Sequence, residues 1–202
     1  MPNQNSPDAQ PCGWHSRGYL PHFDGMETIQ FLTFRLADSL PTFVVEGWID
    51  ELSYLAEDES RMELELRIEQ YLDSGYGACE LRQPQIAQMV ENALFFFDGK
   101  RYHLHAWVLM PNHGHLLLSP FAGYSLSSIV HSLKSFTANE ANRMLQQQGK
   151  FWFPDYYDRY IRDEEHFNHV VNYIEQNPVK AGLCITPDLW PWSSARLKGG
   201  PL

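Results

Sequence analysis

Stretches of apolar residues with strand or helix spacing follow one another along the chain. A β-branched and aromatic run over Thr28–Arg35 predicts a buried strand. Helical spacing of apolar positions follows over Phe43–Leu72 and again over Pro84–Phe97, where the proline suits the first turn. Two apolar segments, Tyr102–Met110 and His113–Leu118, are separated by a short connection and predict a β-hairpin.

The C-terminal half adds two helices and a short strand. Leu126–Leu145 is amphipathic, and Tyr160–Arg162 predicts a strand. Asp163 is a favourable N-cap for a helix that we expect to run to Asn177, where Pro178 ends it. The order strand, helix, hairpin, helix, strand, helix predicts an α+β sandwich, with an antiparallel sheet and helices mainly on one face.

The net charge becomes informative only when it is counted separately for different parts of the chain. The 202 residues suit one domain, and their net charge of −10 argues at first against a nucleic-acid partner. Residues Glu46–Asp73, however, hold ten acidic side chains against two arginines, a net charge of −8. Residues Lys100–Leu202 hold ten basic and eight acidic side chains, a net charge of +2. The total therefore describes one acidic segment and does not exclude DNA.

Other features point to a cytoplasmic protein without a disulfide framework. Cys12, Cys79 and Cys184 are odd in number and widely spaced, which argues against disulfides and a cysteine zinc site. No apolar run has the length of a membrane span, and the polar N-terminus lacks signal-peptide features. We expect an N-terminal tail over residues 1–25, one domain over 26–192 that includes the acidic helical segment 43–73, and a C-terminal tail over 193–202.

The pair His113 and His115 is the sharpest candidate for chemistry. Residues i and i+2 of a strand point to the same face, so the two imidazoles would project side by side and suit a metal ion. Two histidines alone do not make a site, and a half-exposed strand with two ordinary histidines explains the bare motif better. His103 and His105 form a second pair of this kind, for which a structural or DNA-contacting role is favoured.

The predicted last helix carries a polar stripe beside its core face. His166, His169, Tyr173 and Asn177 fall on that stripe, and Tyr173 lies one turn before Asn177. Taken alone, a packed tyrosine and an asparagine cap explain the pair better. Basic and aromatic residues also alternate in the C-terminal half, as single-stranded nucleic acid requires, although a solvated surface gives the same pattern; the cations are Lys134, Arg159, Arg162 and Lys180.

Three motifs in fixed order resemble one protein family. The stretches Leu109–His115 (LMPNHGH), Tyr156–Arg162 (YYDRYIR) and Tyr173–Leu183 (YIEQNPVKAGL) are similar to those of the REP-associated tyrosine transposases, named after repeated extragenic palindromes. These are relatives of the single-strand insertion-sequence transposases within the HUH nuclease superfamily. The resemblance covers roughly Thr28–Trp192, and the Lys134 region resembles the family's middle helix.

The resemblance implies a ferredoxin-like fold and a tyrosine nuclease. By motif position, Tyr173 would be the nucleophile, and His113, His115 and Asn177 would bind a divalent ion, Mg²⁺ or Mn²⁺. His169, one turn before the tyrosine, would be a candidate for catalytic assistance. Arg17 and Tyr19 lie in a segment similar to one that approaches DNA in the family, and they join the four basic residues above as candidate DNA contacts.

The implied partner is single-stranded hairpin DNA resembling a repeated extragenic palindrome. The implied reaction cleaves and rejoins this DNA through a 5′-phosphotyrosine. A monomer is favoured over a dimer that exchanges the tyrosine helix. Two alternatives stay open, a DNA-binding protein of the same fold with a host role and no transposition, and a hydrolase in which water replaces the tyrosine. For the acidic segment 46–73, which departs from the family, a solvated face is favoured over an electrostatic shield or a partner surface.

Overall fold

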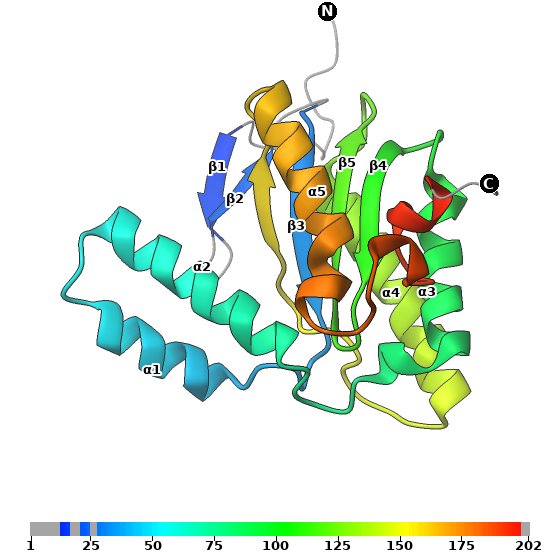
Figure 1. Ribbon diagram of the computed structural model, residues 1–202, viewed down its shortest axis with the longest axis horizontal. Coiled ribbons are helices and arrows are strands. Elements are labelled where there is room, and N and C mark those ends of the chain that lie inside the picture. The colour runs from blue at the N-terminus through cyan, green and yellow to red at the C-terminus, as the bar shows by residue number, and fades with distance from the viewer. Residues whose placement is uncertain (1–12, 17–20, 25–27, 199–202) are drawn as a thin grey trace, which may run out of the picture.

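A four-stranded antiparallel sheet with strand order β4-β5-β3-β6 forms the centre of the computed structural model, which describes residues 13–16, 21–24 and 28–198 (Figure 1). The central pair β3 and β5 is in register from Gln30 opposite Leu118 to Arg35 opposite His113. The strands span β3 Gln30–Arg35, β4 Tyr102–Leu109, β5 His113–Pro120 and β6 Tyr157–Tyr160.

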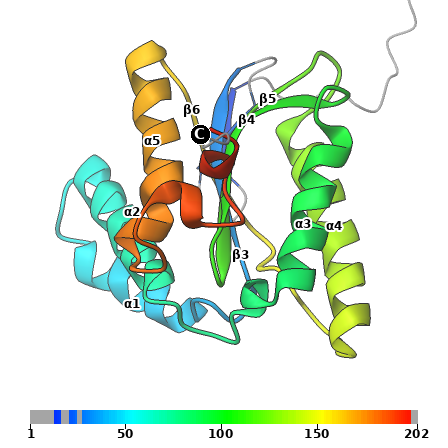
Figure 2. The same ribbon diagram turned by 45° about the vertical axis from the view of Figure 1, so that its right-hand side comes forward.

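Helices cover both faces of this sheet, as Figure 2 shows. Helices α3 (Pro84–Phe97) and α4 (Leu126–Leu145) lie on one face, and α5 (Glu164–Lys180) lies on the other, together with the hairpin of α1 (Thr42–Leu52) and α2 (Glu57–Asp73). The α+β class and the antiparallel sheet are confirmed. We predicted that the helices lie mainly on one face of the sheet. Helices α3 and α4 share one face, but α5 and the hairpin of α1 and α2 lie on the other, so this part of the prediction is wrong.

The central strand β5 explains why both faces are covered. Leu116, Leu117 and Leu118 are consecutive and fully buried, so apolar side chains leave this strand in both directions. Leu116 and Leu118 pack into the core beneath α3 and α4, whereas Leu117 packs with Val170 and Ile174 of α5. A sheet that is apolar on both sides needs a second layer of helix.

Several element boundaries differ from the prediction. The helical stretch 43–72 is two helices, and the acidic residues Glu57–Glu59 in the first turn of α2 favour its start there, where the helix dipole is positive. Helix α5 is capped by the Asp163 side chain as predicted, but it continues through Pro178 to Lys180. The proline removes only one backbone donor so near the end, and the Ala181 amide still bonds the Asn177 carbonyl. Strand β6 spans Tyr157–Tyr160, so it ends at the residue where the predicted strand Tyr160–Arg162 begins.

Within both predicted tails, the described residues form secondary structure. β1 (Gly13–Ser16) and β2 (Pro21–Asp24) pair as a separate antiparallel hairpin, and β2 lies against β6. Arg17 and Tyr19 lie outside the described residues. Within the predicted C-terminal tail, the Ser194 hydroxyl accepts a hydrogen bond from the Trp107 amide. The described residues also form three short 3-10 helices, Glu80–Arg82, Pro187–Leu189 and Ser194–Leu197. Among the described helices, none has the length and apolar character needed to cross a membrane.

Gly114, between the two histidines of β5, leaves room for the side chains of Phe34 and Leu109 from the two neighbouring strands. A Cβ at this position would lie 2.8 Å from Cζ of Phe34 and 3.1 Å from Cδ2 of Leu109. We expect Gly114→Ala to lower the free energy of unfolding by about 1–3 kcal/mol, because the ring and the leucine must shift. Gly47→Ala in α1 is the control, since no atom lies within 4 Å of its added Cβ, and its effect should stay within about 1 kcal/mol. Urea unfolding measures both, and equal effects would contradict this packing account.

Candidate active site

His113 and His115 lie side by side on β5 and face α5. Each is only 1% exposed, and their ring centroids are 4.8 Å apart. The ring of His115 also stacks on Phe31 of β3 at 5.5 Å. The strand period therefore places the two imidazoles together, as predicted, but in a buried position.

The hydrogen bonds of His113 determine which of its two ring nitrogens carries the proton. The Asn112 side chain donates its Nδ2 to the Tyr76 carbonyl, which leaves Oδ1 as an acceptor 2.7 Å from Nδ1 of His113. An amide oxygen can only accept, so Nδ1 carries the proton and Nε2 keeps its lone pair. Nδ1 of His115 lies 2.8 Å from the Thr33 hydroxyl, and its Nε2 faces α5.

Burial keeps both imidazoles neutral. It lowers the pKa of His113 to about 3 and the pKa of His115 well below its usual range, because the charged ring would lose its hydration. A neutral imidazole whose other nitrogen is held by a neighbour is the form in which histidine binds a metal ion. Both histidines meet this requirement.

Helix α5 places the side chains of Tyr173 and Asn177 next to these histidines. The Tyr173 and His115 ring centroids are 5.4 Å apart, and Nδ2 of Asn177 lies 3.4 Å from Nε2 of His115. Asn177 is fully buried, and its Oδ1 has no hydrogen-bond partner among the described residues. The continuation of α5 through Pro178 keeps Asn177 helical, one turn after Tyr173.

These groups fit a divalent metal ion. Two neutral imidazole nitrogens and a buried amide oxygen without a partner form a mixed nitrogen and oxygen donor set. Within the described residues, no group of three His, Cys, Asp or Glu side chains that could hold a metal ion is found. Asn177 is the candidate for a third protein ligand, because its buried amide oxygen has no partner among the described residues.

Sequence reasoning missed the contribution of α2. Glu65, Glu69 and Asp73 recur at every fourth position and therefore lie on one face of the helix. Glu65 lines one cavity together with Tyr157 of β6, and Glu69 lines another together with Tyr173, so each carboxylate acts on the tyrosine beside it. Oδ1 of Asp73 lies 3.7 Å from Nε2 of His113. The four-residue spacing was visible in the sequence, but the partners of this row were not.

This acidic row changes the electrostatics of the tyrosine. Burial first, and then the charges of Glu69 and Asp73, raise the pKa of Tyr173 above its usual value, so the phenol is neutral near pH 7. Burial and the neighbouring Glu69 raise the pKa of Asp73 to about 6. Lys180 partly opposes this negative charge, because its ammonium lies 5.1 Å from the centroid of the Tyr173 ring.

A cavity of about 350 Å³ opens beside the tyrosine, between α2 and α5. Arg159, His169, Glu69 and Tyr173 all contribute to its wall. The volume is within the range of about 300–1,000 Å³ that is usual for ligand sites. Arg159 and Lys180 are thus placed near Tyr173, whereas Arg162 is exposed at the other end of α5. Contacts of these three residues with DNA stay predictions, as does assistance by His169.

Lys134 lies on the opposite side of the sheet, in α4, and holds the chain before β6. Its ammonium donates hydrogen bonds to the carbonyls of Phe153, Pro154 and Asp155 at 2.6, 2.8 and 3.1 Å. Burial lowers the pKa of this amine to about 8. The structure therefore gives Lys134 a role within the fold, and a contact with DNA stays a prediction.

Replacement of Lys134 tests this role within the fold. We expect Lys134→Met to lower the free energy of unfolding by about 2–4 kcal/mol, because three carbonyls lose a charged donor. The exposed Lys150→Met, with the same change of charge, should stay within about 0.5 kcal/mol. Urea unfolding at pH 7 compares the two, and a small effect of Lys134→Met would show that the three bonds contribute little.

The second histidine pair lies elsewhere on the sheet. The rings of His103 and His105 on β4 are 4.7 Å apart, and the His103 side chain is 59% exposed. A hydrogen bond of 3.0 Å joins His105 to Ser119, and His103 lies 3.7 Å from Asp98. His105 also packs edge-on against Phe167 of α5 at 5.4 Å between ring centroids, so the pair contacts this helix nearer its start than Tyr173.

Comparisons with known proteins point to one family. Residues 82–177 match the family described as "Transposase IS200 like" (Y1_Tnp), a stretch that includes both histidines, the tyrosine and the asparagine of the site. The REP-associated tyrosine transposase of Escherichia coli (strain K12) is 28% identical over 109 residues, which are 53% of this chain and 63% of that protein. The chain thus matches less than two thirds of the length of this curated relative.

A solved structure shows the same fold. The structure described as a REP-associated tyrosine transposase bound to a REP hairpin aligns with a TM-score of 0.57 at 17% identity, over 89% of this chain and 84% of that one. Helix α2 lies before the stretch that matches the family. The stretch 82–177 is thus similar to the IS200-like transposases, and the fold is similar to that of a solved REP-associated tyrosine transposase.

Proposed function

We propose that this protein is a metal-dependent transposase that cleaves and rejoins single-stranded hairpin DNA through Tyr173. One observation carries the proposal. Tyr173 and Asn177 of α5 meet His113 and His115 of β5 in a single buried cluster, with 5.4 Å between the Tyr173 and His115 rings. Nucleophile and candidate ligands are therefore neighbours, as covalent catalysis next to a metal ion requires.

The proposed reaction conserves the energy of the DNA linkage. The phenolic oxygen of Tyr173 bonds to the phosphorus of a phosphodiester while the bond from phosphorus to the 3′ oxygen breaks. The phenol loses its proton, and the 3′ oxygen gains one. The products are a 5′-phosphotyrosine and a free 3′-hydroxyl, and attack by a second 3′-hydroxyl on the phosphotyrosine reverses the step and joins two strands.

Three side chains would hold the divalent metal ion, Mg²⁺ or Mn²⁺. These are His113 and His115 through Nε2 and Asn177 through Oδ1, since the other ring nitrogens already have partners. A bound divalent ion polarises a phosphoryl oxygen and favours the phenolate. The protein itself orients the imidazoles through Thr33 and Asn112 and keeps the site dry by burial.

The proposed partner is hairpin DNA resembling a repeated extragenic palindrome. The solved relative is described with a REP hairpin, and Arg159 and Lys180 lie beside Tyr173, where phosphates would approach. We also propose a monomer, because β5 and α5 of one chain bring all four site residues together and no exchanged helix is needed. A DNA substrate further implies a cytoplasmic protein.

Covalent capture tests this function. The protein is incubated with 5′-labelled and 3′-labelled single-stranded hairpin DNA and Mn²⁺, and the products are separated in SDS. We expect an adduct that persists in SDS and carries the label on the 3′ side of the cut, together with a free 3′-hydroxyl on the other fragment. DNA that is shifted in a native gel but never cut would favour a DNA-binding protein with a host role. Cleavage without any adduct would favour hydrolysis by water.

A further inference from the structure

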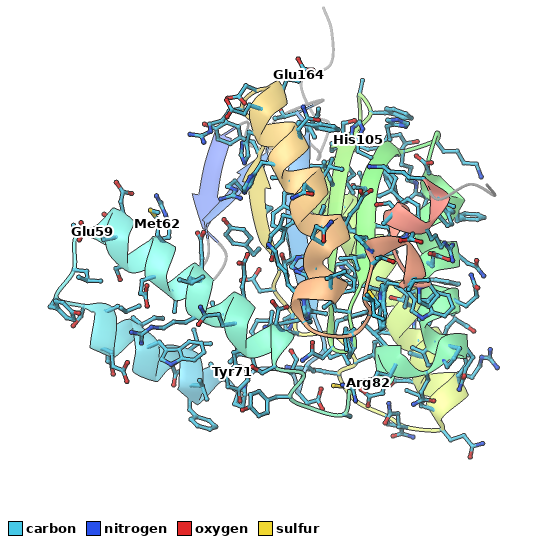
Figure 3. All side chains as sticks on the ribbon, viewed as in Figure 1. Glu59, Met62, Tyr71, Arg82, His105 and Glu164 are labelled. Atoms are coloured by element: carbon cyan, nitrogen blue, oxygen red, sulfur yellow. The ribbon has the colours of Figure 1, made fainter. Side chains whose placement is uncertain are left out.

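The acidic row of α2 forms one wall of the candidate active site. Its three carboxylates face three different groups, since Glu65 lies beside Tyr157, Glu69 shares a cavity wall with Tyr173, and Asp73 lies beside His113. In contrast, Glu59 at the start of the same helix is exposed, and Figure 3 shows it at the end of α2 that points away from α5. The row is thus distinct from the solvated acidic residues of this segment.

We infer that Glu69 is a positioning residue that accepts the hydrogen bond of the Tyr173 hydroxyl and aims its oxygen into the cavity between α2 and α5. The inference rests on the function proposed above and adds a residue to it. Helix α2 ends at Asp73, before the stretch 82–177 that matches the transposase family. The contact is therefore supplied by a part of the chain that the family match does not include.

The groups around the hydroxyl define how it would be oriented. Asn177 lies one turn after Tyr173, and its side chain favours the anionic form of the phenol, as a donated amide hydrogen bond does, whereas the Glu69 carboxylate can only accept. In the inferred arrangement the phenolic proton is directed to Glu69 and one lone pair to Asn177, so one lone pair of the oxygen stays available for attack. Two partners on different helices would hold the hydroxyl more firmly than either would alone.

The surroundings of Glu69 hold its carboxylate in place. One turn earlier Glu65 lies beside Tyr157, and one residue before Asp73 the Leu72 side chain is buried against Leu40 and Val45. Glu69 is itself largely buried, and burial is the main reason that its pKa is raised. The charged groups that act on it are Arg159, Glu65 and Lys180.

His169 is a weaker candidate for the same role. It lines the cavity together with Tyr173 but is exposed, and it precedes the tyrosine by one turn on the same helix. Glu69 approaches from a different element, lines the same cavity, and its charge acts on the phenol. Orientation of Tyr173 is therefore assigned to Glu69, and His169 stays a candidate for contact with substrate.

Three variants test the inference in two measurements on the full-length protein. Glu69→Ala removes the acceptor, Glu69→Gln keeps an acceptor oxygen without the charge, and Glu59→Gln makes the same charge change about 15 Å along the helix. The rate of adduct formation with saturating hairpin DNA and Mn²⁺ should fall at least about 10-fold in Glu69→Ala. Glu69→Gln should recover most of this rate, and Glu59→Gln should match the wild type. The Kd for the hairpin should change less than about threefold in all three, because the contact acts after binding.

Results of other kinds would overturn the inference. An unchanged rate in Glu69→Ala would remove the role, and a faster rate would show that the contact restrains Tyr173. A large change in Kd with an unchanged rate would assign Glu69 to DNA binding.

A spectroscopic readout separates this inference from the proposed function. With 3-fluorotyrosine at position 173, the ¹⁹F resonance should shift in Glu69→Ala and stay unchanged in Glu59→Gln. If the wild type forms no adduct, the proposed function is wrong, and a shift in Glu69→Ala would still support the contact. An unchanged resonance in Glu69→Ala would overturn the inference whatever the activity of the wild type.

Discussion

Replacing Tyr173 by phenylalanine is expected to abolish the covalent protein–DNA adduct. The variant keeps the ring that packs on Phe31 and His115 but loses the attacking oxygen, so adduct formation should fall by at least about 10³-fold. Binding of hairpin DNA should be retained within about threefold, because the ring and the basic residues around it are unchanged. Quantified SDS gels and a fluorescence titration measure the two quantities.

A matched control makes the tyrosine experiment specific. Tyr54 is 81% exposed on the connection between α1 and α2, so Tyr54→Phe should leave both quantities at wild-type values. Cleavage that survives in Tyr173→Phe would contradict the proposed nucleophile and would favour water as the attacking group. Loss of DNA binding in this variant would instead point to a damaged fold, which a thermal melt would show.

The second large effect is expected at the metal site. Replacing His115 by glutamine should lower the affinity for Mn²⁺ at least about 10-fold, because one of the two imidazole ligands is removed. Adduct formation at a fixed Mn²⁺ concentration should fall at least about 100-fold. Isothermal titration calorimetry with Mn²⁺ in the absence of DNA gives the affinity independently of the reaction.

His105 provides the matched control for this experiment. It is half-buried on β4, and a hydrogen bond joins it to Ser119. His105→Gln should therefore change Mn²⁺ affinity by less than about twofold. Equal effects of the two substitutions would show that the metal does not bind at His115, and a wild-type affinity in His115→Gln would contradict the assignment of this ligand.

Local periodicity predicted the part of the site that lies within single elements. Strand alternation was enough to place His113 beside His115, and helical spacing was enough to place Tyr173 one turn before Asn177. Burial of Asn177 was not predictable in this way, because Pro178 is a common end of a helix and here lies inside one. Only the packing of α5 on the sheet brings its amide to His115.

Contacts between distant segments account for what the sequence could not show. The acidic segment 46–73 looked like a solvated face, and its exposed residues such as Glu59 are consistent with that interpretation. Glu69 is different because it meets a tyrosine more than 100 residues later in the chain, and no local pattern specifies that partner. A row of carboxylates at every fourth position was the available signal, but a solvated helix carries the same pattern.

The same contacts refine the meaning of the net charge. The acidic row faces the candidate active site across from Arg159 and Lys180, so negative and positive groups both surround Tyr173. Binding of DNA phosphates should therefore be modest and sensitive to salt. Recognition would rest on the shape of the hairpin and on stacking of unpaired bases more than on attraction of the backbone.

Mapping the DNA attachment site by mass spectrometry tests the central claim most directly. Cleavage after arginine and lysine releases the peptide Asp163–Lys180, in which Tyr173 is the single tyrosine. After reaction with hairpin DNA and nuclease trimming, this peptide should carry a nucleotide through a phosphodiester on Tyr173. A nucleotide on any other residue, or cut DNA with a free 5′-phosphate and an unmodified peptide, would contradict the account.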